Sequence, residues 1–279
     1  MKKFFEGIGL FALVIFSFLG THQLATVIID SDDIMQQIKE VNSQYEISPV
    51  NATIKDNTMI PGISGSIVDI KASYKKMKKI DSFNSNLLVY KKILPDISIK
   101  GDYNKYIISG NKSQNNVGLL FLVDNNDNVD KILDLLKNNK ATFFIDGYWF
   151  ENNNSKISEL IDKGYTIGNL GYNHDYNNNG VVWMNTIVTK IGKQKDTYCY
   201  NEEDNKTILD ICSLNKSYTI KPNIIAKGDP FITIKNNLVN GSIISLEIND
   251  TTLKQLPLII DFIKSKGFNI VNLEEMLNE

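Results

Sequence analysis

The side chains that could take part in hydrolytic chemistry are few and widely spaced along the chain. His174 is the only histidine beyond the N-terminal apolar segment, and its imidazole could bind a divalent metal. The carboxylates of Asp124, Asp175 and Glu247 could complete an irregular ligand set. A catalytic zinc needs three protein ligands and an open position, so His174 alone cannot hold one. The simpler expectation is a histidine at a strand end, bonded to Asp175 or Tyr172, with no metal.

The elements that would position these residues alternate between strand and helix after residue 116. Apolar runs of strand length predict strands at residues 117–123, 141–145, 165–168, 218–226, 242–248 and 268–273. Apolar residues at helical spacing predict helices around 129–136, from 154 or 155 to Gly164, at 205–214, and from an opening between Thr252 and Pro257 to Gly267. A terminal turn of helix is expected at residues 274–277. Repeated strand–helix units of this kind predict an α/β fold with a parallel sheet covered on both faces, either open or closed into a barrel.

Several of these stretches resemble the motifs of one enzyme family. Residues 167–174 read IGNLGYNH, which resembles the pattern I-G-N-H-T-Y-S-H, and residues 141–149 read ATFFIDGYW, which resembles ATFF-x-x-G-x-W. Residues 241–246, GSIISL, resemble a G-S-I-I-L-L strand. These patterns are typical of the polysaccharide deacetylases, the NodB-homology domains that remove acetyl groups from chitin-like and peptidoglycan glycans. The resemblance implies their distorted (β/α) barrel for residues 114–279.

The family hydrolyses the acetamide C–N bond with a bound metal, and most of the residues that do so are missing from this chain. Where the family reads T-F-D-D-G, with the catalytic base and a metal ligand, residues 120–124 read LFLVD. Leu122 and Val123 therefore replace both aspartates. Leu170 stands where the first metal-binding histidine would be. The resemblance thus implies a protein whose metal machinery is degenerate.

The other catalytic motifs are also altered. Residues 198–200, YCY, stand at the family's R-P-P-Y motif, and the chain contains no arginine that could replace its arginine. Residues 246–250, LEIND, stand where the family has its leaving-group histidine. Asp124 and Glu247 are the remaining weak catalytic candidates, and His174 with Asp124 the weak metal candidates. Asp124 could equally belong to a turn and helix cap, and Glu247 could be a solvated carboxylate.

Four aromatic residues are candidates for glycan binding, because they fall at strand ends or in the following loops, where aromatic faces can stack on sugar rings. They are Tyr148, Trp149, Tyr172 and Tyr176. Our leading hypothesis is a catalytically impaired protein that binds N-acetylated, peptidoglycan-like glycan without a cofactor. The first alternative is an active deacetylase that uses zinc or another divalent metal. The second is an envelope scaffold that binds a protein partner through residues 47–113.

The N-terminus predicts export or membrane anchoring. Two lysines, Lys2 and Lys3, precede a largely apolar stretch at residues 4–29, which is long enough to span a bilayer. We expect residues 1–30 to be an uncleaved, single-pass anchor with the rest of the chain outside the cytoplasm, and a cleaved signal of a secreted protein is the alternative. The near balance of 30 basic and 32 acidic residues argues against a nucleic-acid partner.

Residues 31–113 predict a stalk and a small accessory module. Apolar residues at helical spacing between 34 and 45 predict a short helix, which could also pack on the next module. The lysines between residues 71 and 79 could meet anionic lipid or wall polymer, although a solvated helix face explains them as well. Cys199 and Cys212 could form a disulfide outside the cytoplasm, and Cys212 as a buried free thiol is the plainer expectation.

Overall fold

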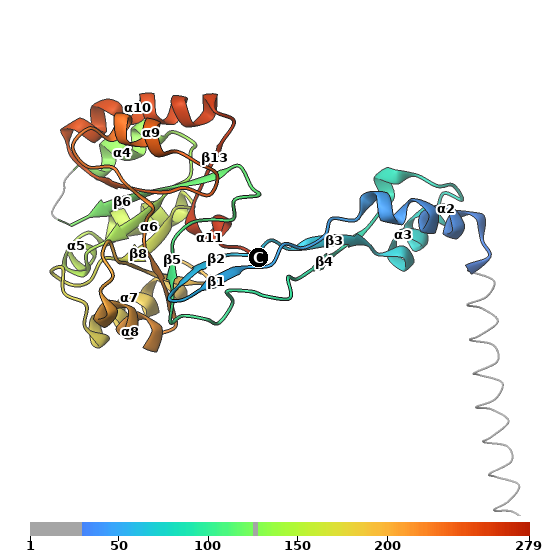
Figure 1. Ribbon diagram of the computed structural model, residues 1–279, viewed down its shortest axis with the longest axis horizontal. Helices are drawn as coiled ribbons and strands as arrows, with labels where there is room; N and C mark the ends of the chain where they lie inside the picture. Colours follow the sequence, from blue (N-terminus) through green and yellow to red (C-terminus); the bar gives the residue numbers. More distant parts are fainter. Residues whose placement is uncertain (1–29, 125–127) are drawn as a thin grey trace, which may run out of the picture. The chain divides into compact units, whose positions relative to one another are not determined.

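The computed structural model describes residues 30–124 and 128–279. The expected anchor at residues 1–30 therefore lies outside the described residues, except for Asp30, and stays a prediction. Within the described ranges no helix is long and apolar enough to cross a bilayer. The chain forms two compact units (Figure 1). The smaller contains residues 30–49 and 64–93, and the larger contains residues 50–63 and 94–279.

The smaller unit packs two helices beside a two-stranded ribbon. The expected short helix is α2, and the Asp32 carboxylate caps it by accepting the Ile34 N–H at 3.0 Å. Ile34 and Ile38 are buried with Met77 of the second helix, so α2 packs within this unit rather than standing alone. The ribbon pairs its strands antiparallel. The elements are α2 (Asp33–Val41), η1 (Asn42–Tyr45), β3 (Gly65–Val68), α3 (Ile70–Met77), η2 (Ser85–Leu87) and β4 (Tyr90–Ile93).

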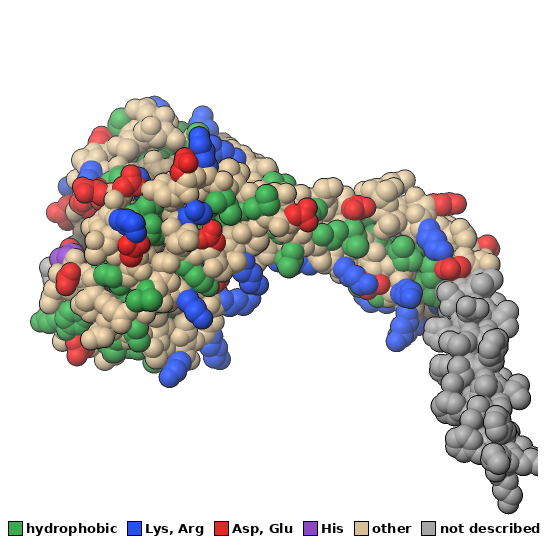
Figure 2. Space-filling view, turned by 60° about the horizontal axis from the view of Figure 1, so that its bottom comes forward, with side chains coloured by type: hydrophobic (Ala, Val, Ile, Leu, Met, Phe, Trp, Pro, Cys, Tyr) green, Lys and Arg blue, Asp and Glu red, His purple; other side chains and the backbone are tan. Residues whose placement is uncertain are grey.

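The lysines of α3 are exposed, and so are Lys78 and Lys79, which follow it. Ser73 and Met77 of the same helix are buried. Figure 2 shows lysine side chains, in blue, on the surface of this unit. Lys78 forms ion pairs with Asp32 at 2.9 Å and Asp81 at 2.7 Å. The lysine cluster is therefore a solvated helix face that is partly neutralised within its own unit.

The larger unit is built on one sheet, whose strands follow the order β1-β2-β5-β10-β9-β8-β7-β6-β12-β11, with β13 paired to β6. Neighbours are parallel except β1 and β2, so the expected parallel sheet is confirmed. The order ends at β1 and β11 and does not return on itself in the described residues, which makes the sheet an open half-barrel. Its strands are β1 (Thr53–Lys55), β2 (Thr58–Ile60), β5 (Tyr106–Ile107), β6 (Asn116–Val123), β7 (Thr142–Ile145), β8 (Thr166–Asn169), β9 (Thr197–Tyr200), β10 (Ser217–Ile220), β11 (Ile224–Ile225), β12 (Ile243–Glu247) and β13 (Asn269–Val271).

Two differences from the expected strands follow from their positions in this sheet. The accessory module was expected to extend to residue 113, but β1, β2 and β5 lie in the larger unit as strands of its sheet. The expected strand at residues 218–226 is divided around Pro222 into β10 and β11, which pair with different neighbours. Proline lacks the N–H that a continuous strand would contribute at this point.

Alternating side chains give the sheet two apolar faces. Phe121 and Val123 of β6 face the helices, where they join a large core. Leu120 faces the other way and packs with Phe144 of β7 and Tyr198 of β9. We call this second group the inner cluster. Because side chains from strands far apart in the sheet meet there, the sheet curves around it.

The helices of the larger unit include three that were not predicted: α5, α7 and α9. The helix α10 was predicted to open between Thr252 and Pro257, but it begins at Asp250 and contains Pro257. Pro257 is exposed, so the Leu253 carbonyl that it leaves without a donor can meet water. The helices are α4 (Val129–Leu136), α5 (Gly147–Asn152), α6 (Asn154–Asp162), α7 (Asn178–Lys190), α8 (Lys206–Leu214), α9 (Pro230–Asn237), α10 (Asp250–Ser265) and α11 (Leu273–Met276).

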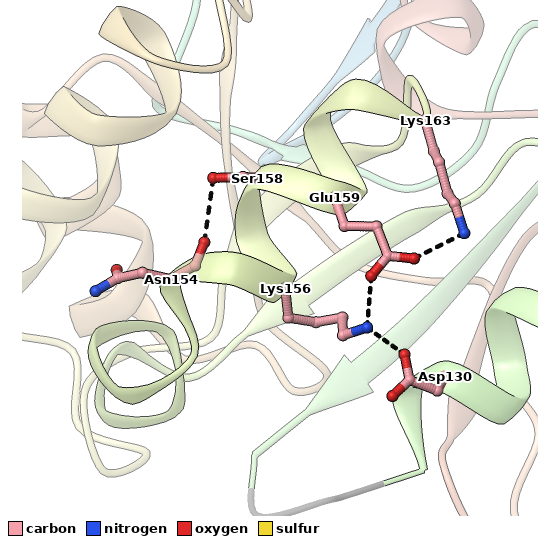
Figure 3. A network of polar contacts seen from close by, with 6 residues as sticks. All are labelled: Asp130, Asn154, Lys156, Ser158, Glu159 and Lys163. Carbon is pink, nitrogen blue, oxygen red and sulfur yellow. Dashed lines mark hydrogen bonds and ion pairs between the residues drawn. The ribbon is translucent and has the colours of Figure 1, made fainter.

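Surface ion pairs join two helices that cover the sheet. Lys156 of α6 contacts both Asp130 of α4 and Glu159 of its own helix, while Lys163 contacts the same Glu159 at 2.8 Å (Figure 3). The hydrogen bond that Lys156 donates to Asp130 is the main reason that the pKa of Lys156 is raised. Exposed ion pairs contribute little to stability, so these contacts add little to the free energy of unfolding.

Candidate functional site

The residues considered for chemistry lie along the edge of the sheet where β6, β7, β8 and β12 end. Parallel strands bring their carboxyl ends together at one edge, where α/β proteins commonly bind ligands. We call this edge the mouth. Asp124 follows β6, Asp146 follows β7, Leu170 follows β8, and Glu247 ends β12.

His174 lies in a tight turn after β8. The N–H of Tyr172 donates to the carbonyl of Asp175 at 2.8 Å, and the return bond is 3.1 Å. The central residues Asn173 and His174 have φ of 50° and 61°, the positive values that type I′ turns require. A left-handed backbone is unfavourable for a histidine, so neighbouring contacts must hold it.

Asp146 provides such a contact. Its Oδ2 accepts the backbone N–H of His174 at 2.8 Å, while its Oδ1 caps α5 by accepting the Tyr148 N–H at 2.9 Å. The side chain is only 4% exposed. Asp146 was missed in the sequence, although an aspartate directly after a strand and before Gly147 is a helix-cap signal. It ties the histidine turn to the end of β7.

The imidazole of His174 faces Asp124. Its Nε2 lies 3.6 Å from Asp124 Oδ2, and the two side chains are 58% and 45% exposed. Asp124 continues the alternation of Leu120 and Leu122 and so lies on the inner side of β6; it is not the cap of α4, which is Asn128. The expected side-chain partners of His174, Asp175 and Tyr172, instead bond to each other through the backbone.

The positions that carry the family's base and first histidine hold leucines. Leu122 and Leu170 are partly buried against the inner cluster, which includes Phe144 and Tyr200. In residues 30–124 and 128–279 no three His, Cys, Asp or Glu side chains are grouped to hold a metal ion, and Asp127 lies outside those ranges. Asp124 and His174 supply two candidate ligands where a catalytic zinc takes three. The described residues therefore do not fit the family's metal.

Glu247 lies at the end of β12, on the other side of β6 from the His174 turn, and belongs to a separate set of charges. Its carboxylate is 51% exposed and 3.9 Å from the ammonium of Lys227, which is bound more closely by Glu202 at 2.7 Å. The hydrogen bond that Lys227 donates to Glu202 is the main reason that the pKa of Lys227 is raised. Tyr200 connects this set to β12, because its hydroxyl is 2.8 Å from that of Ser245. Glu247 is thus a solvated, lysine-paired carboxylate.

The four aromatic candidates divide into two accessible and two structural residues. Tyr148 is 51% exposed and meets Tyr172 edge to face, with centroids 6.4 Å apart. The Tyr172 hydroxyl donates to Glu151 at 2.8 Å, and this bond raises the pKa of Tyr172. Trp149, in contrast, is 8% exposed and packs in the core under the helices, which leaves little surface for a sugar.

Tyr176 has a structural contact of its own. Its hydroxyl donates to the Asn169 carbonyl at 2.6 Å and accepts the Tyr200 N–H at 3.0 Å, so it bridges β8 and β9. Burial raises the pKa of this hydroxyl strongly. The polar end of Tyr176 is therefore used inside the protein. Tyr148 and Tyr172 remain the accessible aromatic pair at the mouth.

Residues 109–210 match the family model described as polysaccharide deacetylase. The chain carries a divergent polysaccharide deacetylase domain. The uncharacterized protein YlxY of Bacillus subtilis (strain 168) is 28% identical to it over 284 residues, which cover 91% of this chain and 86% of YlxY.

Solved structures resemble both the deacetylase domain and much of the rest of the chain. Wild-type BA3943 of Bacillus anthracis, described as a CE4 family pseudoenzyme, is 25% identical with a TM-score of 0.66, covering 89% of this chain and 96% of that one. A BA3943 mutant described as having restored enzymatic activity has 25% identity, a TM-score of 0.67, and covers 89% and 99%. The Bc1960 peptidoglycan N-acetylglucosamine deacetylase, 22% identical with a TM-score of 0.56 and covering 61% and 92%, shares the fold.

The deacetylase domain also contains a disulfide that was not the favoured expectation. Cys199 of β9 and Cys212 of α8 are bonded, with their Cα atoms 6.4 Å apart, so Cys212 is not a free thiol. Both side chains are fully buried beside Val181 of α7. The bond fixes α8 against β9, the strand that ends at Tyr200.

Proposed function

We propose that this chain is a cell-envelope protein whose deacetylase domain binds N-acetylated, peptidoglycan-like glycan and has lost most or all hydrolytic activity. The observation that carries the proposal is the packing of Leu122 and Leu170 in the inner cluster. Carbon side chains there supply neither a base nor a metal ligand. The same leucines pack against the inner cluster, so the floor of the mouth is apolar and their burial stabilises it.

The glycan surface in this proposal is the pair Tyr148 and Tyr172. Sugar rings present C–H faces that pack on aromatic rings, and the edge-to-face arrangement leaves the Tyr148 ring accessible. Glu151, which accepts the Tyr172 hydroxyl, holds one ring in place before a ligand arrives. A ring fixed in advance binds with a smaller entropic cost.

Retention on purified peptidoglycan tests this surface. We expect full-length protein carrying Tyr148→Ala to bind about five- to tenfold more weakly, because one ring contact is lost. The matched control is Tyr90→Ala, since Tyr90 is a similarly exposed tyrosine, at 48% against 51%, in the smaller unit. Equal retention of the two variants would remove the support for this surface.

A divergent active deacetylase is the second candidate, and the Asp124–His174 contact favours it. Two ligands that each lie about 2.0–2.2 Å from a tetrahedral zinc are roughly 3.3–3.6 Å apart. The Nε2 atom of His174 and the Oδ2 atom of Asp124 are 3.6 Å apart. The test is zinc content and acetate release from N-acetylglucosamine oligomers for the wild type, His174→Ala and Leu170→His. Under the leading proposal only Leu170→His, which adds a third ligand beside this pair, gains stoichiometric zinc. Zinc in the wild type that is lost in His174→Ala, together with acetate release, would establish the second candidate instead.

The proposed location is outside the cytoplasmic membrane, with residues 4–29 as the anchor. Two features support it. The first is the apolar N-terminal sequence behind Lys2 and Lys3. The second is the Cys199–Cys212 disulfide, because such bonds persist in oxidising compartments. Accessibility of a cysteine-reactive, membrane-impermeant label at an engineered surface position, such as Ser158→Cys, tests the orientation in intact cells. Labelling only after cell lysis would contradict it.

A further inference from the structure

A polar hollow lies at the edge of the sheet opposite the mouth. It has a volume of about 400 Å³ and opens where β9 and β10 begin, beside the second half of α7. We call it the amino-edge groove. Its wall includes Tyr103, Asn185, Thr186, Thr189, Asp196 and Lys216. None of these residues belongs to the mouth, because the strands run from the groove towards it.

Asp196 is the acidic group in this wall, which also contains Lys195 and Lys216. Its side chain is partly buried, and no hydrogen bond to its carboxylate forms within the described residues; only its backbone carbonyl accepts one, from Gln194 at 2.7 Å. Burial, followed by repulsion from Glu274, raises the pKa of the Asp196 carboxyl. A partly desolvated carboxylate without donors is unfavourable, and a ligand that donates hydrogen bonds relieves that cost.

The threonines of α7 add further acceptors. Thr186 Oγ1 donates its hydrogen to the Val182 carbonyl at 2.7 Å, and Thr189 Oγ1 donates to the Asn185 carbonyl at the same distance. With their hydrogens used inside the helix, both oxygens present only lone pairs to the groove. The groove therefore favours a ligand rich in O–H and N–H donors.

Tyr103 provides a flat apolar surface next to these acceptors. Its ring packs on that of Tyr218, with centroids 4.8 Å apart. The Tyr218 hydroxyl is itself held by the Gly101 N–H at 3.3 Å and the Ile99 carbonyl at 3.4 Å, so the supporting ring is fixed. An aromatic face beside several acceptors matches a sugar, which has a C–H face and a rim of hydroxyls.

We infer that the amino-edge groove is a second glycan-binding site, which holds a sugar ring on Tyr103 and accepts its hydroxyl or amino donors at Asp196 and the α7 threonines. Lys216, at the rim, can donate to ring or glycosidic oxygens. The inference goes beyond the proposed function, since it concerns different residues at the opposite edge of the sheet. It holds whether or not the mouth binds glycan.

Calorimetric titration of the full-length protein in detergent with tetramers of N-acetylglucosamine and of glucosamine tests the groove. The titrations are made in the Tyr148→Ala background, so that binding at the mouth is weakened. We expect Asp196→Asn to weaken at least one tetramer about tenfold, because an isosteric amide loses the charged acceptor. Tyr103→Leu should weaken it similarly.

The matched control is Glu274→Gln, which removes the carboxylate next to Asp196 but not part of the groove wall. It should bind both tetramers as well as the parent does. Thermal melting of each variant shows that the fold is kept, and Asp196→Asn should melt no lower than the parent because it removes a partly desolvated charge. Unchanged affinity in both Asp196→Asn and Tyr103→Leu, or equal loss in Glu274→Gln, would overturn the groove. Neither outcome bears on Tyr148, which tests the mouth separately.

Discussion

The Cys199–Cys212 disulfide offers a perturbation whose size follows from the structure. It joins β9 to α8 across a sequence separation of 13 residues, and both sulfur-bearing side chains are fully buried. Closing a loop of about 15 residues restricts the unfolded chain by about 3 kcal/mol. We therefore expect reduction to lower the unfolding free energy of the larger unit by about that amount.

This free energy corresponds to a measurable change in melting temperature. The larger unit contains residues 50–63 and 94–279, and for a unit of this size each kcal/mol moves the midpoint by roughly 2–4 °C. Reduction should thus lower the midpoint by about 6–12 °C. Because both cysteines are buried, dithiothreitol should reduce the native protein slowly and the partly unfolded protein quickly.

The assay is thermal unfolding followed by circular dichroism, with and without reductant, on protein isolated from an oxidising compartment. The double variant Cys199→Ala/Cys212→Ala is the control, since reductant should not change its midpoint. Its own loss of packing is measured separately by comparison with the reduced wild type. Two titratable thiols in the unreduced protein would refute the reasoning. So would a midpoint that reductant leaves unchanged in the wild type.

Three further outcomes are expected. Asp146→Ala should lower the unfolding free energy by about 2 kcal/mol in urea, because it removes a helix cap and the acceptor for the His174 N–H; a loss below about 0.5 kcal/mol would contradict this. Tyr176→Phe should cost about 1–2 kcal/mol in the same assay yet leave peptidoglycan retention unchanged, because its hydroxyl is buried between strands; weaker retention at full stability would show the opposite. The hydrogen bond from Lys78 lowers the pKa of Asp32 below 3.8, so this carboxylate stabilises the smaller unit fully above about pH 4 and progressively less as pH falls through its lowered pKa. Asp32→Asn should make acid unfolding of that unit less steep, and an unchanged pH profile would count against the ion pair.

The elements with strong local signals were predicted well. The run at β6 and the ATFFI strand at β7 were identified from their apolar residues, and α8 begins one residue after the predicted start of its helix at Asn205, which caps it. These segments carry their own periodicity and capping groups, so neighbouring residues are enough to identify them. The fold inference rested on such segments in the right order.

The helix α7 shows where local signals fail. Its sequence, NNGVVWMNTIVTK, is rich in β-branched residues and contains Gly180, both of which disfavour helices. It is helical because Val181, Met184 and Val188, on one face of the helix, are buried against the rest of the larger unit. Burial of that face outweighs propensity, and only the packed sheet provides the surface to be covered.

The sequence by itself determined the central strands β6, β7, β8 and β12 with several of their helices, the motifs of a deacetylase domain, and the loss of its arginine and paired aspartates. Those properties reside in neighbouring residues and in the identity of side chains. Only the tertiary structure decided that Asp124 meets His174, that Leu122 and Leu170 pack against the inner cluster, that Trp149 is buried, and that the Tyr176 hydroxyl is bonded inside the protein. These relations depend on strand register and on which face of the sheet each side chain occupies. Both are set by burial across segments far apart in the chain, and no local pattern encodes them.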